Sequence, residues 1–296
     1  MDEHGVARWA ASGAMALTGL PDRALGPPAG LVEGVERLAS ACPGLDPLAL
    51  LGERAALMGL WRRGTTSCGG SCRLFPARDG WLAVSLPRAE DVELVPAWLE
   101  LGETPRAGPA TWAVVGRAVA VRDPAELLAR AALLGLPVSR LGDAGDAPAL
   151  VPQRLGDAPA RPARDLVVVD LSGLWAGPLC GDLLAGAGAT VVKVESTGRP
   201  DGARRGPAAF FDLLNWRKRS VALELPGDEG TRRLHGLIGR ADVVIEASRP
   251  RALAHFGVSA RDMVRAGGPQ VWISITGHGR VGAAGDRVAF GDDAAV

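Results

Sequence analysis

Glycines and cations lie next to three β-rich runs of this sequence, where they could bind a phosphorylated ligand. Residues 165–195 run from a strand through a turn containing Gly173 and Gly177 into a helix and a second strand. Such a turn lets a ligand approach the backbone and the free N–H groups of the helix N-terminus, which favour anions. Taken alone, Gly177-Pro178 is better explained as the end of a loop and the start of a helix.

Cations accompany two further strands. Residues 217–219 are Arg, Lys and Arg and precede the run SVALEL, while Arg249 and Arg251 follow the run DVVIEA. A charge run is ordinarily a solvated loop, but in an open α/β sheet ligands bind outside the carboxyl ends of the strands. Together with the glycine turn, these cations predict a site for a polyphosphate ligand.

A nicotinamide cofactor is the alternative ligand for the same turn. Glu195 lies where a dinucleotide-binding fold has an acidic residue at the end of its second strand. However, the turn reads GLWAGP rather than G-x-G-x-x-G, and Lys193 lies two residues before the glutamate. The sequence therefore leaves an NAD-dependent oxidoreductase open without favouring it.

The overall composition narrows the classes of partner. The chain has 296 residues, and its 33 Lys and Arg balance its 33 Asp and Glu, so neither nucleic acid nor an anionic membrane is expected as the main partner. We find no signal segment and no run of about 18 apolar residues. Four cysteines are too few for a disulfide framework. These features predict a cytoplasmic protein.

Other site types have weaker support. Cys68 and Cys72 flank a glycine loop, but no second ligand pair for zinc accompanies them, so two free thiols and no metal are expected. The four histidines are dispersed and match no H-E-x-x-H pattern, and no G-x-S-x-G or phosphate-loop motif occurs.

The elements that must position these residues differ between the two halves. From residue 165 on, strands such as LVVVDL, TVVKVE and DVVIEA alternate with helical segments, which predicts an α/β fold with a Rossmann-like, doubly wound parallel sheet over residues 165–296. Residues 146–164 are rich in Pro, Ala, Asp and Arg and are expected to be a linker.

Residues 1–145 are expected to form a helical part and a smaller α+β region. The segment RLFPARDGWLAVSL predicts a hairpin with its turn at residues 78–80, and residues 89–101 predict one helix. A further helix should begin after Asp123, an N-cap, and end at Gly135, followed by the short strand PVSRL.

Four strings, in order, resemble one family: VVVDLSGLWAGPLCGDLLAGAGATVVKVE, NWRKRSVALEL, ADVVIEASRP and ISITGHG. They are similar to the N-terminal half of the family III CoA-transferases (the CaiB/BaiF type), a group that includes formyl-CoA transferases and α-methylacyl-CoA racemases. The resemblance covers residues 166–296. It implies binding of CoA or an acyl-CoA as substrate, and transfer of CoA between carboxylic acids through an aspartyl intermediate. The racemase branch would instead exchange the proton α to the thioester carbonyl.

The N-terminal region resembles later segments of the same family, so the order is rearranged. We interpret this as a permuted, fused architecture or a sequence cut short. In this register Gly30 stands where the family has its catalytic aspartate, with Asp22 before it and Glu33 after it. Because glycine has no nucleophile, the catalytic residue is left unassigned, and a non-catalytic acyl-CoA-binding paralogue remains the alternative.

The resemblance also implies binding positions. The turn after the first strand would wrap backbone around CoA, and basic or polar side chains of later loops would contact it. Ala247 replaces an asparagine of the family pattern, and one of the implied contacts, a histidine, stands where the family often has arginine. Relatives in this family form interlocked homodimers, so a homodimer is implied here. The implied CoA-binding residues are Trp175, Ala176, Lys218, Ser248, Arg249, His255 and Arg287.

Overall fold

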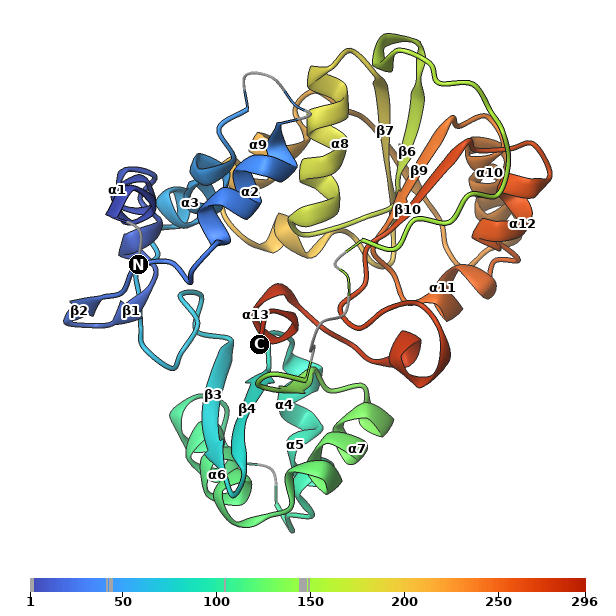
Figure 1. The fold of residues 1–296 in the computed structure, drawn as a ribbon. Helices are drawn as coiled ribbons and strands as arrows, with labels where there is room; N and C mark the ends of the chain where they lie inside the picture. Colours follow the sequence, from blue (N-terminus) through green and yellow to red (C-terminus); the bar gives the residue numbers. More distant parts are fainter. Residues whose placement is uncertain (1–2, 41, 43–44, 104, 144–147, 149) are drawn as a thin grey trace. The chain divides into compact units, whose positions relative to one another are not determined.

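The computed structural model describes the chain except for residues 1–2, 41, 43–44, 104, 144–147 and 149. The chain divides into two compact units, shown in Figure 1. Unit 1 comprises Met1–Gly145 together with Val288–Val296, and unit 2 comprises Asp146–Arg287. Unit 1 therefore includes the last nine residues, which we had expected to belong with the second half. The expected linker belongs to unit 2, and its described residues from 150 to 162 form no helix or strand.

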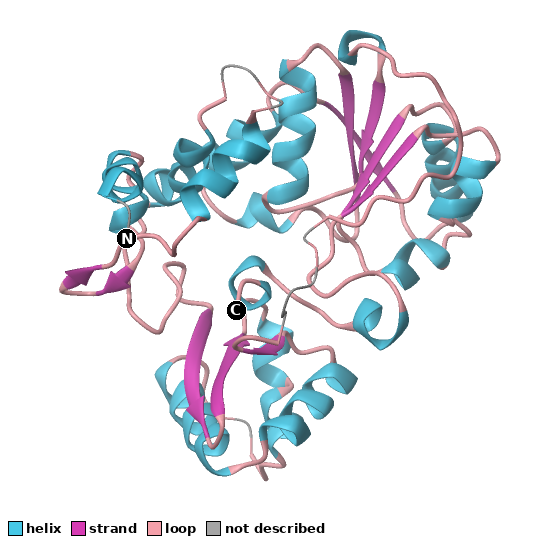
Figure 2. Ribbon diagram, viewed as in Figure 1, coloured by secondary structure: helices cyan, strands magenta, loops and turns pink. Residues whose placement is uncertain are grey.

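Unit 2 is built on a five-stranded sheet in which every pairing is parallel (Figure 2). The spatial order is β10-β9-β6-β7-β8. The chain thus builds the sheet in one direction from β6 and then returns to build it in the other. This arrangement confirms the predicted doubly wound α/β fold. The strands are β6 (Val167–Asp170), β7 (Thr190–Ser196), β8 (Arg219–Leu223), β9 (Val243–Glu246) and β10 (Val271–Ser274).

Apolar side chains alternate between the two faces of this sheet. Val169 packs with Leu234 and Ile238 of α10, whereas its neighbour Val168 belongs to a second cluster that includes Leu184 of α8. Because strand side chains alternate with period two, consecutive valines cover opposite faces. The helices are α8 (Ala176–Gly186), α9 (Ala208–Asn215), α10 (Asp228–Ile238), α11 (Pro250–Ala254) and α12 (Ala260–Arg265), with short 3-10 turns at η2 (Ala163–Asp165), η3 (Gly202–Arg205) and η4 (Gly282–Asp286).

The α+β part of unit 1 contains a three-stranded antiparallel sheet ordered β3-β4-β5. The predicted hairpin is confirmed, with Ala77 paired to Gly80 around a two-residue turn. Asp123 caps its helix, and Gly135 ends it in the left-handed conformation, as expected. The helix predicted at residues 89–101 is instead two helices, interrupted at Leu94. These elements are β3 (Cys72–Ala77), β4 (Gly80–Ser85), β5 (Val138–Arg140), α4 (Ala89–Glu93), α5 (Val95–Leu99), α6 (Pro109–Val121), α7 (Pro124–Leu134) and α13 (Gly291–Ala294).

The N-terminal part of unit 1 is mainly helical. A small core of Trp9, Ala14, Val32 and Leu48 holds it together. Its elements are α1 (Glu3–Ala11), η1 (Ala14–Ala16), β1 (Gly19–Leu20), β2 (Arg23–Ala24), α2 (Leu31–Ala39) and α3 (Pro47–Met58). Among the described residues of the whole chain, no helix is long and apolar enough to cross a membrane.

Candidate functional site

The strand order of unit 2 reverses between β6 and β9, which are direct neighbours in the sheet. In open α/β sheets the crevice at such a switch point, outside the carboxyl ends of the strands, is where ligands bind. Two segments form this edge: the turn from Leu171 to Trp175 after β6, and residues 247–249 after β9. The amide of Leu171 donates to Ile245 O (2.8 Å), which joins the two strand ends.

A buried ion pair supports the start of the turn after β6. Lys218 Nζ lies 2.8 Å from Asp170 Oδ2, and both side chains are at most 1% exposed. The ammonium also donates to Pro178 O (2.7 Å) and Asn215 Oδ1 (3.0 Å). On its other oxygen, Asp170 accepts from the amide and the hydroxyl of Ser172. Lys218 therefore ties the end of β6 to the first turn of α8.

Burial is the largest influence on the ammonium of Lys218 and lowers its pKa, while the charge and hydrogen bond of Asp170 oppose that shift. A buried cation remains in place only when its donors are satisfied and its charge is compensated. Here three protein acceptors perform that role.

A second buried pair fixes the middle of the same turn. Lys193 Nζ lies 2.9 Å from Asp201 Oδ2, with both side chains 1% exposed, and donates to Ser172 O (3.0 Å). Asp201 Oδ1 accepts from the amides of Leu174 and Ala203, both at 2.9 Å. Leu174 adopts the left-handed conformation, with φ 68°, which is uncommon for a residue other than glycine.

Opposing effects act on the Asp201 carboxyl group. Burial raises its pKa, but the amides of Ala203 and Leu174 and the ammonium of Lys193 outweigh it and hold the pKa below its ordinary value. Asp201 is therefore held as a carboxylate that orients the turn. We call the four residues Asp170, Lys193, Asp201 and Lys218 the turn clamp.

The glycines of the turn are required by packing. A methyl group at Gly177 would lie 2.2 Å from Ser172 Cβ, and one at Gly173 would lie 3.2 Å from Asp201 Oδ1. One at Gly181 would lie 3.0 Å from both Asp170 Oδ2 and Lys218 Nζ. The turn can approach the clamp this closely only because these positions lack a side chain.

The loop after β9 begins at another buried acid. Glu246 has no exposed surface and accepts hydrogen bonds from Trp272 Nε1 (3.1 Å), Ser274 Oγ (2.8 Å) and Ser248 Oγ (3.1 Å). It also forms an ion pair with Arg280. Glu246 thus fixes the start of this loop and the neighbouring strand β10.

Four of the sequence-predicted residues come together at the switch-point edge. Trp175 is the N-cap of α8 and is half-buried beside Leu179, and Ala176 is the exposed first residue of that helix. Ser248 donates to Glu246, and Arg249 is the N-cap of α11. They come from the two loops that follow the neighbouring strands β6 and β9.

The other three predicted residues lie elsewhere in unit 2. Lys218 is enclosed in the turn clamp, so its direct contact with a ligand remains a prediction. His255 is the exposed C-cap of α11. Arg287 directly follows η4, a turn that packs against α11 and is linked to it by the ion pair Arg251–Asp286 (3.8 Å).

Sequence reasoning missed Asp170, Asp201, Asn215 and Glu246. The available signal was Lys193: a lysine within the run TVVKVE of a buried strand demands a buried carboxylate. Glu195, the acid that an NAD site would use, instead accepts from the Asp201 amide (2.9 Å) and from Arg204. The guanidinium of Arg204 is the main reason that the pKa of Glu195 is below its usual range.

Gly30, which the sequence comparison aligned with the catalytic aspartate of the family, lies in unit 1. Gly30 is the N-cap of α2, is exposed, and has φ 76°. A methyl group there would meet no other atom within 4 Å. Space for an acidic side chain therefore exists, although the left-handed conformation favours glycine.

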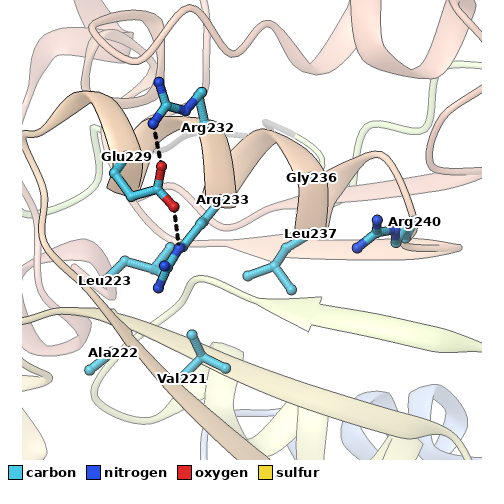
Figure 3. A pocket seen from close by; sticks show the side chains of 9 residues that line it. All are labelled: Val221, Ala222, Leu223, Glu229, Arg232, Arg233, Gly236, Leu237 and Arg240. Atoms are coloured by element: carbon cyan, nitrogen blue, oxygen red, sulfur yellow. Dashed lines mark hydrogen bonds and ion pairs between the residues drawn. The ribbon is translucent and has the colours of Figure 1, made fainter.

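A pocket of about 420 Å³ lies away from the switch-point edge, between α10 and β8 (Figure 3). Two of its cations, Arg232 and Arg233, are both paired with Glu229. It contains none of the predicted CoA-binding residues. We therefore assign it no role in the site. Elsewhere in the part of the chain that the structure describes, none of the four cysteines forms a disulfide, and no group of three or more potential metal ligands occurs.

Comparison with known proteins matches this region to one family. Residues 164–295 match the model of "CoA-transferase family III". The succinyl-CoA–D-citramalate CoA-transferase of Chloroflexus aurantiacus is 32% identical over 140 residues, covering 45% of this chain and 35% of that protein. The succinate–glutarate CoA-transferase of Agrobacterium fabrum is 33% identical over 149 residues, covering 45% and 37%.

A solved structure of a CaiB/BaiF family protein from Brucella suis is 34% identical and covers 44% of this chain and 37% of that one, with a TM-score of 0.40. The matched part thus spans little more than a third of the relatives' length. All of unit 2 from β6 on lies within the matched range. The resemblance to CoA-transferase family III, which the sequence predicted, is therefore confirmed over residues 164–295 of this chain.

Proposed function

We propose that unit 2 binds the CoA part of an acyl-CoA at the switch-point edge, and that the protein transfers CoA between an acyl-CoA and a carboxylic acid. The turn clamp carries this proposal. It uses two buried ion pairs to hold one short turn, including the left-handed Leu174, against a glycine-bearing helix start. Such rigid support is what a backbone that wraps a ligand requires.

The turn itself would supply backbone and apolar contacts. Trp175 offers an aromatic surface beside the exposed Ala176, and Arg249 of the neighbouring loop offers a cation for a phosphate of CoA. The two buried lysines of the turn clamp would orient the turn without contacting the ligand. This division of roles replaces a direct Lys218–phosphate contact as the main expectation.

The chemistry would use a carboxylate nucleophile. That carboxylate attacks the thioester carbonyl, the CoA thiolate leaves, and a mixed anhydride forms. The thiolate then attacks the enzyme's acyl carbon, the first acid leaves, and the acceptor carboxylate repeats both steps in reverse. Gly30 cannot provide this group, so we assign no nucleophile.

Gly30 favours a second candidate function, the binding of acyl-CoA without turnover. A transfer assay separates the two. The protein is mixed with succinyl-CoA and a panel of carboxylates that includes citramalate, malate and glutarate, and the acyl-CoA products are identified by mass spectrometry. New thioesters support the transferase. Saturable CoA binding without exchange supports the binding protein. Exchange of the α-proton with deuterated water would instead identify a racemase.

Calorimetry tests the binding site. We expect CoA to bind, NAD not to compete, and Arg249→Gln to weaken CoA binding by about 1–3 kcal/mol because a charge-assisted hydrogen bond is lost. Arg265→Gln, on α12, is the control with the same loss of charge. Equal losses in both variants, or displacement of CoA by NAD, would contradict the proposed site. Sedimentation of the same samples checks the expected homodimer.

A further inference from the structure

Strand β8 forms one edge of the five-stranded sheet of unit 2. It pairs with β7, and among the described residues no other strand pairs with it. The pocket of about 420 Å³ beside α10 is lined by three consecutive residues of this strand, Val221, Ala222 and Leu223 (Figure 3). Because strand side chains alternate between the two faces, a pocket that reaches three residues in a row lies along the edge of the strand.

The register of the sheet shows which backbone groups face this edge. The amide of Thr197, directly after β7, donates to Leu223 O (2.9 Å), so the backbone of Leu223 faces β7. In a parallel pair, residues that bond to the neighbouring strand alternate with residues whose N–H and C=O point away. The backbone groups of Ser220 and Ala222 therefore point to the open side of β8. Such a row of donors and acceptors is a template for another strand.

Cationic side chains outnumber carboxylates around the same pocket. Arg232 and Arg233 on α10 share one carboxylate, that of Glu229. Arg240, two residues after the end of α10, forms no ion pair with any carboxylate of the described residues. All three arginines are exposed, so their guanidinium groups are accessible to a ligand in the pocket.

Apolar side chains form the floor of the pocket between these charges. Leu223 is buried, and the half-buried Val221 and Leu237 pack against the same core cluster. The methylene groups of an acidic side chain would lie over this floor while its carboxylate reaches a guanidinium group. The pocket thus combines backbone groups, an apolar floor and positive charge.

We propose that the open edge of β8 binds an extended acidic peptide, which adds to the sheet as a further parallel or antiparallel strand. The peptide backbone would pair with Ser220 and Ala222, and its carboxylates would lie beside the arginines that line the pocket. Charge favours this partner over a second copy of the chain, because two edges lined by arginine repel each other. The inference concerns unit 2 alone and does not depend on the binding of CoA.

Peptide titration of the whole protein tests the proposal. The probe is a blocked peptide in which glutamate alternates with valine, and calorimetry measures its affinity. We expect saturable binding. N-methylation of every second peptide amide, made in both registers, should weaken binding about tenfold in the register that faces β8, because backbone hydrogen bonds are lost. Replacing the glutamates with lysine should abolish binding.

Variants of opposite charge change locate the acidic side chains of the peptide. Arg240→Gln should weaken binding about two- to fivefold, as expected for an exposed ion pair. Glu229→Gln should strengthen binding by a similar factor, because it releases two guanidinium groups. Arg265→Gln, exposed on α12, is the control with the same loss of charge. Ala222→Pro removes an N–H only on the open side of β8 and should abolish binding.

Circular dichroism confirms that each variant is folded, and the N-methylated peptides need no variant at all. Absence of saturable binding, equal affinity of the N-methylated peptides in both registers and the unmodified peptide, or an equal loss in Arg265→Gln would overturn the proposal. Displacement of the peptide by succinate at comparable affinity would overturn it in favour of a site for a small carboxylic acid. Self-association that Ala222→Pro abolishes would overturn it in favour of a second copy.

Discussion

In unit 2 the ammonium groups of Lys193 and Lys218 are almost completely buried, and each meets a carboxylate of the same unit. In unit 1 the guanidinium of Arg63 lies beside Gly70, that of Arg73 stacks on the Trp112 ring, and neither forms an ion pair with a carboxylate of the described residues. Lys218 and Arg63 lie beside Gly181 and Gly70, which allow close approach. The two lysines use their charge to hold backbone, whereas Arg63 is exposed and Arg73 packs on an aromatic ring.

The difference shows that a cation beside a strand end is not by itself a ligand contact. Lys218 was expected to reach a phosphate, but three protein acceptors surround its ammonium. Pairing and burial, which only the three-dimensional structure provides, decide which cations serve the fold and which serve a ligand.

The largest change in stability should follow from breaking the Lys193–Asp201 pair of the turn clamp. Lys193→Met leaves the Asp201 carboxylate buried without its partner, so the free energy of unfolding should fall by about 3–5 kcal/mol. Urea unfolding followed by tryptophan fluorescence measures it. Arg204→Gln, which breaks the more exposed pair with Glu195, should cost less than about 1 kcal/mol. Similar losses in the two variants would remove the distinction between clamp and surface pairs.

Variants of Lys218 test whether this residue only orients the turn or also contacts a phosphate of CoA. Lys218→Met should lower the free energy of unfolding by about 3 kcal/mol, and adding Asp170→Asn should recover part of that loss, because the buried charge is then gone. CoA affinity should recover together with stability if Lys218 only orients the turn. Affinity that stays low in the double variant would restore the direct phosphate contact.

The glycine at the helix start should be intolerant of a side chain. Gly177→Ala places a methyl group against Ser172 Cβ and should cost about 1–3 kcal/mol of unfolding free energy. Gly236, on α10, has nothing within 4 Å of a methyl group, so Gly236→Ala should stabilise by about 0.5–1 kcal/mol. Thermal unfolding measures the change in stability of each variant. A change of the same sign in both variants would contradict the prediction.

The smallest effect concerns a buried acid of unit 1. Burial raises the pKa of Asp293 on α13, so its ionised form opposes folding. The free energy of unfolding should therefore fall as pH rises from the unfolded pKa, about 3.9, through the higher folded pKa. Asp293→Asn should flatten this dependence and stabilise the protein by on the order of 1 kcal/mol at neutral pH. The exposed Asp292 is the smallest of the named causes that shift the pKa of Asp293, so Asp292→Asn should flatten the pH profile much less than Asp293→Asn does.

Local patterns in the sequence predicted the elements of unit 2 well. Runs such as VVVD and VVIE are short, β-branched and bounded by turns, so the parallel sheet followed from them. The hairpin around Asp79 and the capped helix after Asp123 also depend only on neighbouring residues. The break at Leu94 was missed, although Pro96 lacks the N–H that would donate to Val92 O in a continuous helix. Helices α6, α9 and α12 were also missed.

The turn clamp could not be predicted from local sequence patterns because its paired residues are far apart in the sequence. Lys218 and Asp170 are 48 positions apart, and Asp201 lies in a loop without periodicity. Lys193 was read only as an argument against NAD. The residues of the switch-point edge were found because the resemblance to the family placed them there. Whether they contact CoA stays a prediction.

The assignment of Val288–Val296 to unit 1 has a consequence for synthesis of the protein. Helix α13 packs on β4 and β5, yet it follows all of unit 2 in the sequence. On the ribosome, unit 2 is therefore complete before the final helix of unit 1 emerges. Since domains tend to fold as units during synthesis, unit 1 can complete its fold only after unit 2 has been synthesised. Until then, the residues of β4 and β5 that α13 contacts lack that helix.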